Sequence, residues 1–389
     1  MVQSNANTFS RFTEVLLIME KSKVYFTNFR AKPDANLLQK LRRLIEKAGM
    51  TQMPLEGKFT AVKIHFGEPG NLAFLRPNYA RVVVDTLKDM GARPFLTDCN
   101  TLYTGMRRNA LDHLEAAYEN GFSPLQTGCH ALIADGLLGT DDVAVPIEGE
   151  YCKQALIGRA VMDADAIISL THFKCHEGTG IGGALKNLGM GCGSTAGKRA
   201  MHCDGKPVVD HDRCVGCGLC ARQCAHGAIS FSGEKGARRA TIDHNRCVGC
   251  GRCVGACRDR GAIQGPDSSN DLLNRKISEY AWAVIKDRPH FHISLVMDVS
   301  PYCDCHAEND SPVIADVGMF ASFDPVALDV ACADACNRMQ PLPGTFLAAK
   351  EQHTGDIFND THPYTNWRAG VEHAAKLGVG SMDYELIEV

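Results

Sequence analysis

The sequence predicts an α/β protein with a mostly parallel sheet, flanking helices and one small α+β insert. Strand-like apolar runs alternate with helical patterns on both sides of a short segment that is dense in cysteine and glycine. That segment also contains an internal repeat. We therefore expect a host domain formed by residues 19–204 and 267–389, interrupted by an insert at 205–266.

The expected elements of the host follow in chain order. The helices show apolar residues three or four positions apart, whereas the strands are short apolar runs bounded by turn residues such as Gly67-Glu68-Pro69-Gly70. The first part predicts strands at 60–65, 94–97, 131–134 and 166–171, with helices at 79–90, 108–119 and 153–162. The second part predicts helices at 271–286, 325–335 and 367–376, with strands at 292–299 and 313–315.

Composition excludes several classes of protein. The chain has 389 residues, of which 45% are hydrophobic and 22% charged, as in ordinary globular proteins. A formal charge of −4 is too small to indicate nucleic acid or a membrane surface as a partner. No window approaches the roughly 20 apolar residues that cross a bilayer. We expect no nucleic-acid partner and no membrane span.

The N-terminus and the cysteine count bear on location. Residues 12–19 (FTEVLLIM) form a poor signal peptide, because one arginine precedes them and no cleavage site follows. Our hypothesis is that residues 1–18 are a non-native or disordered extension before a start at Met19. Eighteen cysteines in a long chain without an export signal indicate metal binding rather than disulfides. We expect a reducing cytoplasm, in an organism that tolerates oxygen-sensitive clusters, such as an anaerobe.

The insert carries the spacing C-x2-C-x2-C-x3-C twice. This spacing is that of bacterial two-cluster ferredoxins, in which the fourth cysteine of each run ligates the other cluster. The sequence therefore predicts a ferredoxin-like insert with two [4Fe–4S] clusters and a function in electron transfer. The first cluster is assigned to Cys214, Cys217, Cys220 and Cys257, and the second to Cys247, Cys250, Cys253 and Cys224.

Two features of the insert qualify this interpretation. Ala225 and Arg258 follow the fourth cysteines, where ferredoxins commonly have proline. Four-cysteine sites also bind zinc, but two tandem copies of this spacing favour iron–sulfur clusters. Residues 205–265 contain ten Lys or Arg against five Asp or Glu. These charges either compensate the clusters or dock an acidic electron carrier.

Three polar segments of the host suggest a second site. Lys63 to Glu68, Thr171 to Glu177 and Asp298 to His306 each lie at the end of an expected strand, where open α/β sheets bind ligands. A single histidine or lysine there is usually surface, but three such segments indicate a shared site. The candidate catalytic residues are Lys63, His65, His172, Lys174, His176, Lys186 and Asn187. Cys303 and Cys305 could supply a further metal site, completed by Cys175, His172 or His176.

Two nucleotide-binding motifs are absent. Gly191 to Lys198 resembles a P-loop, but five residues separate its outer glycines and Arg199 stands where Ser or Thr must hold magnesium. No G-x-G-x-x-G fingerprint follows the first strand. A nicotinamide dehydrogenase is therefore disfavoured.

Four stretches of the host resemble the domain of unknown function 362 family. They are KIHFGEPGN (63–71), DCNTLYTG (98–105), HFKCHEGTGIGGALKNLG (172–189) and DVGMFASFDPVALD (316–329). Members of this family often carry an inserted or appended double ferredoxin. The resemblance implies this architecture, iron–sulfur binding and a cytoplasmic or anaerobe-associated setting, but it supplies no reaction.

Three functions compete. In the first, an oxidoreductase, the insert passes single electrons to a substrate or metal in the host. Lys63, Lys174 and Lys186 then clamp an anionic small molecule while His65, His172 or His176 supply protons. The second is a non-catalytic electron-transfer module that docks a partner oxidoreductase. The third is an iron–sulfur sensor or maturation factor using the cysteines outside the repeats as reactive thiols: Cys99, Cys129, Cys152, Cys175, Cys192, Cys203, Cys303, Cys305, Cys332 and Cys336.

Overall fold

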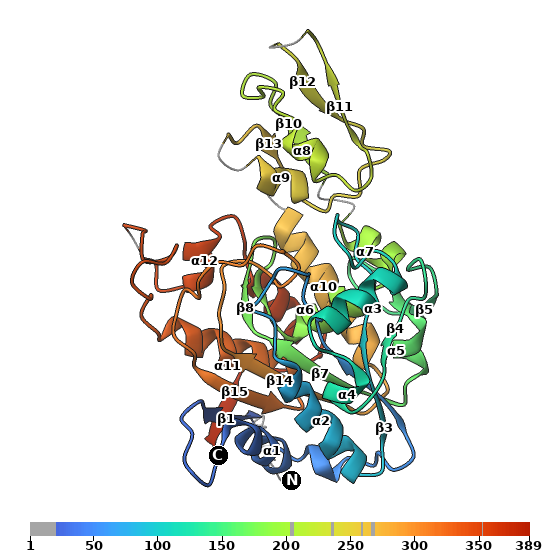
Figure 1. Ribbon diagram of the computed structural model, residues 1–389, viewed down its shortest axis with the longest axis vertical. Coiled ribbons are helices and arrows are strands. Elements are labelled where there is room, and N and C mark those ends of the chain that lie inside the picture. The colour runs from blue at the N-terminus through green and yellow to red at the C-terminus, as the bar shows by residue number, and fades with distance from the viewer. Residues whose placement is uncertain (1–20, 203–205, 235–236, 258–259, 266–268, 352) are drawn as a thin grey trace, which may run out of the picture.

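The molecule consists of a large host and a lobe that projects from one end of it (Figure 1). The computed structural model describes residues 21–202, 206–234, 237–257, 260–265, 269–351 and 353–389. The lobe is the segment from 206 to 265, so the chain leaves the host and returns to it. The expected extension at 1–18 lies outside the described residues.

An eight-stranded sheet forms the centre of the host. Its order is β16-β1-β15-β14-β7-β2-β3-β4. Only β15 runs against its neighbours β1 and β14, and the other pairs are parallel. The predicted mostly parallel sheet is thus confirmed. The strands are β1 Ser22–Asn28, β2 Phe59–Lys63, β3 Arg93–Asp98, β4 Ala131–Ile133, β7 Ala166–His172, β14 His290–Val296, β15 Gly318–Ser322 and β16 Tyr384–Glu388.

Helices cover both faces of this sheet. Neighbouring residues of a buried strand enter opposite cores, so Ala61 packs in one core and Val62 in the other. The first core lies under α6 (Ala184–Cys192), α10 (Ser269–Ile285), α11 (Pro325–Asn337) and α13 (Arg368–Lys376). The second lies under α1 (Leu37–Lys47) and α2 (Pro77–Asp89). Among the described residues, no helix combines the length and apolar character needed to cross a membrane.

Shorter elements complete the host. The remaining helices are α3 Ala110–Glu119, α4 Pro124–Thr127, α5 Arg159–Asp163, α7 Thr195–His202 and α12 Ile357–Thr361, with a 3-10 turn at Met50–Gln52. Two small hairpins stand apart from the main sheet. They are formed by β5 (Asp142–Pro146) with β6 (Gln154–Gly158), and by β8 (Lys174–His176) with β9 (Gly180–Gly182).

Two expected elements of the host are wrong. The helix expected at 153–162 is strand β6 followed by the short helix α5, because Gln154–Gly158 pairs with Asp142–Pro146. The strand expected at 313–315 makes only one bridge, between Ile314 and Pro341. The strand that enters the sheet is β15, a few residues later.

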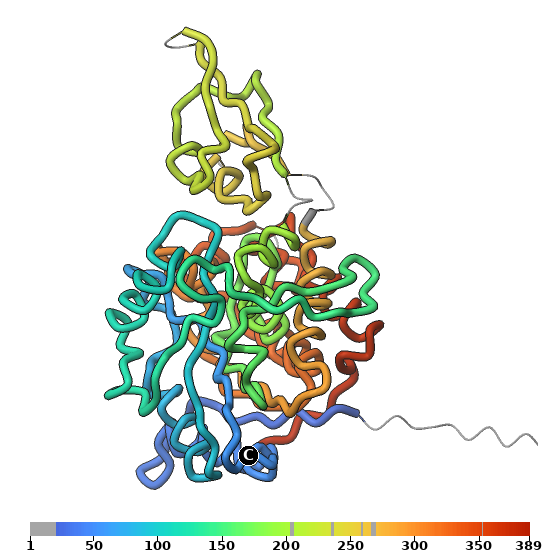
Figure 2. The backbone as a smooth tube through the Cα atoms, turned by 90° about the vertical axis from the view of Figure 1, so that its right-hand side faces the viewer, coloured from blue at the N-terminus to red at the C-terminus, as the bar shows by residue number. Residues whose placement is uncertain are grey.

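The lobe has a small fold of its own. β10 (Val208–Val209) pairs with β13 (Ile263–Gln264), and β11 (Ile229–Ser232) pairs with β12 (Arg239–Ile242). The short helices α8 (Leu219–Arg222) and α9 (Arg252–Ala256) complete it, with α9 on the side nearer the host (Figures 1 and 2). Its buried core is Cys214, Cys220, Ala240, Cys253, Ala262 and Ile263. Three of these six residues are cysteines of the repeat.

Candidate functional site

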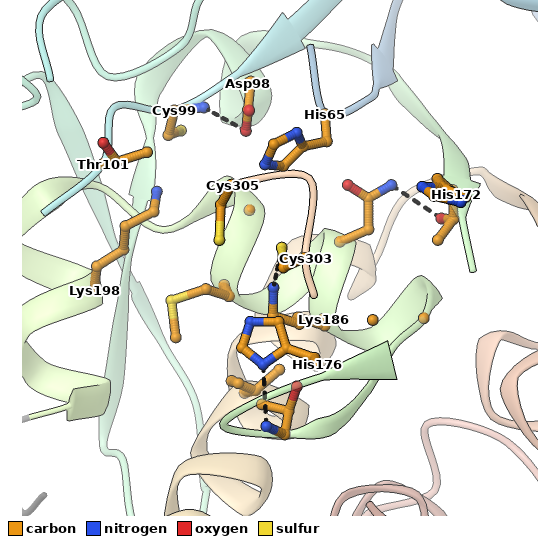
Figure 3. Close-up of a pocket in the computed structure, with 18 of the residues that line it drawn as sticks. His65, Asp98, Cys99, Thr101, His172, His176, Lys186, Lys198, Cys303 and Cys305 are labelled. Carbon is orange, nitrogen blue, oxygen red and sulfur yellow. Dashed lines mark hydrogen bonds between the residues drawn. The ribbon is translucent and has the colours of Figure 1, made fainter. Parts of the chain in front are cut away.

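A pocket lies at the carboxyl ends of the central strands (Figure 3). Its volume is about 120 Å³. Lys63, Asp98 and His172, the last residues of β2, β3 and β7, line it, as expected for parallel strands that end at one edge of a sheet. Cys250 and Arg252 of the lobe also line it. The pocket is therefore built jointly by the host and the lobe.

All seven candidate catalytic residues line this one pocket. They come from strand ends, the β8–β9 hairpin and helix α6, which are distant in sequence. Their convergence is a structural fact, whereas their catalytic roles stay predictions. The seven are Lys63, His65, His172, Lys174, His176, Lys186 and Asn187.

Lys63 is held in a buried ion pair. Its Nζ lies 3.0 Å from Oδ1 of Asp98 and donates to Oδ1 of Asn187 at 2.8 Å. Burial raises the pKa of Asp98, but Lys63 and His113 outweigh burial and hold that pKa well below its ordinary value. The charge of Lys63 is therefore balanced within the protein, which differs from the expected clamp on an anion.

Asp304 balances the charge of Lys174 in the same way. Lys174 Nζ donates to Oδ2 of Asp304 at 2.8 Å, and His172 Nδ1 lies 2.8 Å from Oδ1. Despite the effect of burial, these two partners lower the pKa of Asp304 far below its ordinary value. His172 Nε2 donates to the carbonyl of Met297 at 2.8 Å, so both its nitrogens are engaged. His172 is therefore unsuited to complete a metal site.

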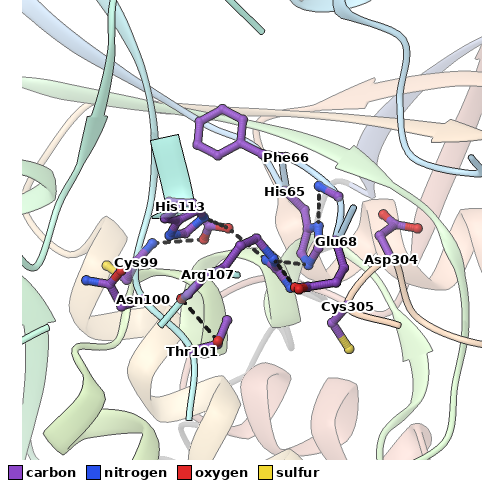
Figure 4. A network of polar contacts seen from close by, with 12 residues as sticks. His65, Phe66, Glu68, Cys99, Asn100, Thr101, Arg107, His113, Asp304 and Cys305 are labelled. Atoms are coloured by element: carbon purple, nitrogen blue, oxygen red, sulfur yellow. Dashed lines mark hydrogen bonds and ion pairs between the residues drawn. The ribbon is translucent and has the colours of Figure 1, made fainter. Parts of the chain in front are cut away.

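Arg107 lines the pocket and is the centre of a network of polar contacts (Figure 4). It is fully buried, with Nε 2.9 Å from Oε2 of Glu68 and Nη1 3.0 Å from Nε2 of His65. Burial and the guanidinium lower the pKa of His65 well below 6.5. His65 is thus neutral at pH 7, which differs from the expectation that it supplies protons. Sequence reasoning missed Arg107 because it follows β3 in a loop without periodic pattern.

Cys303 and Cys305 face the pocket beside Lys186 and His176 (Figure 3). Lys186 Nζ lies 3.7 Å from the Cys303 sulfur, and donor atoms of His176, Cys303 and Cys305 lie within 4.8 Å of one another. A hydrogen bond from Cys305 and the Lys186 ammonium outweigh burial, so the pKa of Cys303 lies well below its ordinary value.

Cys175, another expected ligand, is not part of this group. Its sulfur contacts Oγ1 of Thr361 at 3.9 Å in the apolar core. Burial raises its pKa to about 12, so it is an inert thiol rather than a thiolate.

The cysteines of the lobe fall into two groups in the structure, and the assignment of each group to one cluster stays a prediction. Cys224, Cys247, Cys250 and Cys253 line one cavity together with the apolar Ile229 and Ile242. We call these four the near set, because Cys250 also lines the host pocket. Burial and then its neighbours Cys250, Cys247 and Cys224 raise the pKa of Cys253 to about 12.

The other four cysteines form the distal set. Burial raises the pKa of Cys220, and the other thiols that act on it are Cys217, Cys257 and Cys214. Backbone N–H groups donate to sulfurs of both sets, from Ala240 to Cys214, Ala228 to Cys224 and Gly249 to Cys247, each at 3.4 Å. Such bonds to thiolate sulfur are typical of iron–sulfur sites. The donor chemistry of both sets fits the expected clusters.

Arg252 joins the lobe to the host. Its Nη2 donates to the carbonyl of Cys305 at 2.7 Å, and its Nη1 lies 3.1 Å from Nδ1 of His306. The guanidinium also stacks over the ring of Tyr103 at 4.2 Å. A second contact runs from Nε2 of His226 to the carbonyl of Leu102 at 2.8 Å. These contacts fix the near set at the mouth of the pocket.

The chain matches a known family over most of its length. The profile described as domain of unknown function (DUF362) covers residues 60–334. An uncharacterized ferredoxin of Methanocaldococcus jannaschii is 34% identical over 73 residues, which are 19% of this chain and 48% of that protein. The chain thus spans about half the length of this curated relative.

Two solved structures are also similar. The lactate racemase apoprotein from Thermoanaerobacterium thermosaccharolyticum is 11% identical, with a TM-score of 0.31, and the match covers 71% of this chain and 51% of that one. A protein from Thermotoga maritima is 13% identical, with a TM-score of 0.36, and the match covers 77% of this chain and 58% of that one.

Proposed function

Because the chain belongs to the DUF362 family, whose description assigns no reaction, we propose its function from the site. The protein is an iron–sulfur oxidoreductase in which the lobe relays single electrons into the host pocket. One observation carries this proposal: Cys250 and Arg252 of the lobe line the same pocket as the seven host residues.

Two [4Fe–4S] clusters are the proposed cofactors, one on the distal set and one on the near set. When bound, such clusters supply single-electron transfer at potentials set by hydrogen bonds to sulfur, charge and solvent exposure. The chain's part is to hold the thiols, to donate backbone N–H groups to them and to place Arg252 between the near set and Cys305.

Electrons enter at the distal set. Cys217 is exposed there, next to the exposed apolar side chains of Val215 and Leu219. The arginines Arg213 and Arg222 are exposed on the same part of the lobe. An apolar centre with cationic neighbours suits brief docking of an acidic one-electron carrier. The partner is therefore proposed to be a small acidic redox protein.

The ligand of the pocket is proposed to be a small anion. Lys63, Lys174 and Arg107 are paired with buried carboxylates. Lys186 instead contacts a sulfur, and Lys198 Nζ donates to the carbonyl of Gly193 at 2.5 Å. These two cations line the pocket and attract a carboxylate or phosphate. We also propose a reducing cytoplasm as the setting, because eighteen cysteines in a long chain, eight of them in two cluster-type repeats, indicate metal binding rather than disulfides.

Metal analysis of anaerobically purified protein tests the cofactors. About eight iron and eight sulfide per chain are expected, and Cys217→Ser or Cys250→Ser should each disturb one cluster only. Fewer than four iron, with zinc in their place, would refute the proposal.

Arg252→Ala tests the relay. Removal of a cation beside the near set should lower the reduction potential of one cluster and leave the other unchanged, as followed by electron paramagnetic resonance. Arg213→Ala is the matched control, because Arg213 is exposed and lies next to Cys214. If Arg252→Ala moved neither potential, the near set would not be coupled to the pocket. The chain would then act as an electron-transfer module without a reaction of its own.

A further inference from the structure

The two pocket thiols lie on a loop that is held firmly from its other side. Asp304, between them, points away toward Lys174 and His172, and its carbonyl accepts a hydrogen bond from the N–H of Glu68 at 2.9 Å. Asp304 is fully buried. This anchoring leaves the sulfurs of Cys303 and Cys305 together at the pocket wall (Figure 3).

Hydrogen-bond donors converge on the Cys303 sulfur. Lys186 Nζ lies 3.7 Å away. His176 Nδ1 accepts the backbone N–H groups of Gly178 and Thr179 at 2.9 and 3.1 Å, so the proton of the neutral ring lies on Nε2. Nε2 is the nitrogen on the side of the two thiols (Figure 3). Cys303 therefore sits where a thiolate is stabilised by an ammonium and an imidazole N–H.

The same geometry disfavours a metal ion. A metal would need the lone pair of His176 Nε2, and the ring proton would then have to point at two N–H donors. An ammonium beside the thiols would also repel a cation. A second possible group of metal ligands consists of Glu177, Cys305 and His306. Both ring nitrogens of this histidine already have partners, since Nε2 lies 2.8 Å from Glu177 and Nδ1 lies 3.1 Å from Arg252.

We infer that Cys303 and Cys305 form a redox-active dithiol that cycles with a disulfide across the C-x-C segment. The anionic Cys303 sulfur is the attacking atom, and Cys305 is the resolving thiol. Cysteines two positions apart span at most about 7 Å, close to the largest Cα separation of ordinary disulfides, ~6.8 Å. The two sulfurs already lie within 4.8 Å of each other, so the bond is within reach of this loop.

The oxidising substrate is a disulfide of low molecular weight. A cavity of about 120 Å³ is smaller than the ~150 Å³ that holds benzene, so only a short arm of a substrate enters it. The Cys303 thiolate attacks one substrate sulfur and releases the first thiolate. The Cys305 thiol then attacks Cys303, its proton goes to the second leaving thiolate, and the Cys303–Cys305 bond forms.

Reduction restores the dithiol. Two electrons, arriving singly from the lobe, and one proton break the bond, leaving the Cys303 thiolate and the Cys305 thiol. Only this source of electrons rests on the proposed function. The path for electron transfer from the lobe to the thiols is short, because Arg252 of the lobe donates a hydrogen bond to the carbonyl of Cys305.

Redox titration by mass spectrometry tests the dithiol. The anaerobic protein is equilibrated in buffers of reduced and oxidised dithiothreitol, quenched in acid, alkylated and cut after glutamate. The peptide 280–308 contains only Cys303 and Cys305, whereas 309–351 contains Cys332 and Cys336. The first peptide should titrate as a two-electron couple. The second is an internal control that should stay reduced, since burial raises the pKa of both its thiols well above the ordinary value.

Variants assign the roles. Cys305→Ser should abolish the couple. Lys186→Gln should shift the equilibrium between the Cys303–Cys305 dithiol and its disulfide about tenfold toward the disulfide, which is ~30 mV for two electrons. The reason is that the variant lacks the ammonium that stabilises the Cys303 thiolate. Lys186→Arg should restore the equilibrium. A peptide 280–308 that stays fully reduced under all buffers would overturn the inference. So would stoichiometric zinc or another metal that is lost in Cys303→Ser.

Cys250→Ser separates this inference from the proposed relay. In this variant, the Cys303–Cys305 couple measured in dithiothreitol buffers should match that of the protein without substitutions. Reduction of the Cys303–Cys305 disulfide by reduced methyl viologen should slow at least tenfold. An unchanged viologen rate would refute the relay and leave the dithiol standing. If the protein without substitutions held two intact clusters but peptide 280–308 showed no couple in the dithiothreitol buffers, the dithiol would be refuted and the relay would stand.

Discussion

The lobe and the host pocket organise their reactive groups in opposite ways. In the pocket, buried charges are paired with one another, as Lys63 is with Asp98, Arg107 with Glu68 and Lys174 with Asp304. In the lobe, three of the six buried core residues are cysteines of the two sets. These charges of the pocket are thus balanced within the protein, whereas half of the buried core of the lobe consists of thiols that the proposed clusters would bind. With the proposed clusters, we expect the folding of the lobe, and not that of the pocket, to depend on a cofactor.

Removal of iron should separate the two regions most strongly. After anaerobic chelation, proteolysis within residues 206–265 should accelerate on the order of 100-fold, because the lobe loses the bonds that replace an apolar core. The host should stay folded. Both tryptophans, Trp282 and Trp367, lie in the host, so the urea midpoint of their fluorescence should not change. Equal protection of the lobe with and without iron would contradict this comparison.

Asp304→Ala should produce the next largest effect, in the host. It leaves the Lys174 ammonium and His172 buried without their carboxylate, which costs about 3–5 kcal/mol in free energy of unfolding. Urea unfolding followed by tryptophan fluorescence measures it. The control is Glu308→Ala, four residues away, where an exposed carboxylate pairs with His306 and should contribute about 1 kcal/mol or less. A loss for Asp304→Ala as small as that of the control would show that the pairing does not hold the pocket.

Acid should destabilise the host through buried histidines. Burial lowers the pKa of both His113 and His292 below 6.5, and His290 lowers that of His292 further. Below pH 6.5 these two histidines become protonated in the unfolded chain but stay neutral in the folded chain. Stability is therefore present above pH 6.5 and is lost as the pH falls toward the folded pKa values. The loss should be ~1.4 kcal/mol per pH unit for each histidine.

The matched variant for this pH dependence is His292→Gln. It should flatten the dependence of the unfolding free energy between pH 5.5 and 6.5 by about three quarters of a proton, as measured by urea unfolding at several pH values. His292 is fully buried and hydrogen-bonded to Ser169 at 2.9 Å, so the variant is also less stable at pH 7.5. An unchanged slope would show that His292 already binds a proton in the folded chain.

The same contrast explains what the sequence could predict. The two sets of cysteines follow from local spacing, because each repeat places three thiols within one short loop. The pocket followed from a rule of topology, since Lys63 and His172 end neighbouring parallel strands and must lie at one edge. Both predictions used residues whose places follow from a local spacing or from the end of a strand.

The rest depended on contacts that the sequence does not display. Arg107 reaches Glu68 and His65 from an irregular loop. Gln154–Gly158 forms a strand only because it pairs with Asp142–Pro146, although its apolar pattern also suits a helix. The orientation of β15 depends on its antiparallel pairing with β1, almost 300 residues earlier. The pairing of Lys63 and Lys174 with carboxylates could not be read from their strands alone.

The lobe is attached to the host at both of its ends, after α7 and before α10. A free ferredoxin must find its acceptor by diffusion, and its transfer rate rises with concentration. In the proposed relay, a lobe that is tethered twice, with Cys250 at the pocket wall, keeps a fixed and high local concentration of electron donor at the pocket. Transfer within the molecule should then be first order and insensitive to dilution. Protein concentration and ionic strength would then affect only the docking of the external electron carrier near Cys217. Selective docking and fast transfer to the pocket would thus take place at different parts of one chain.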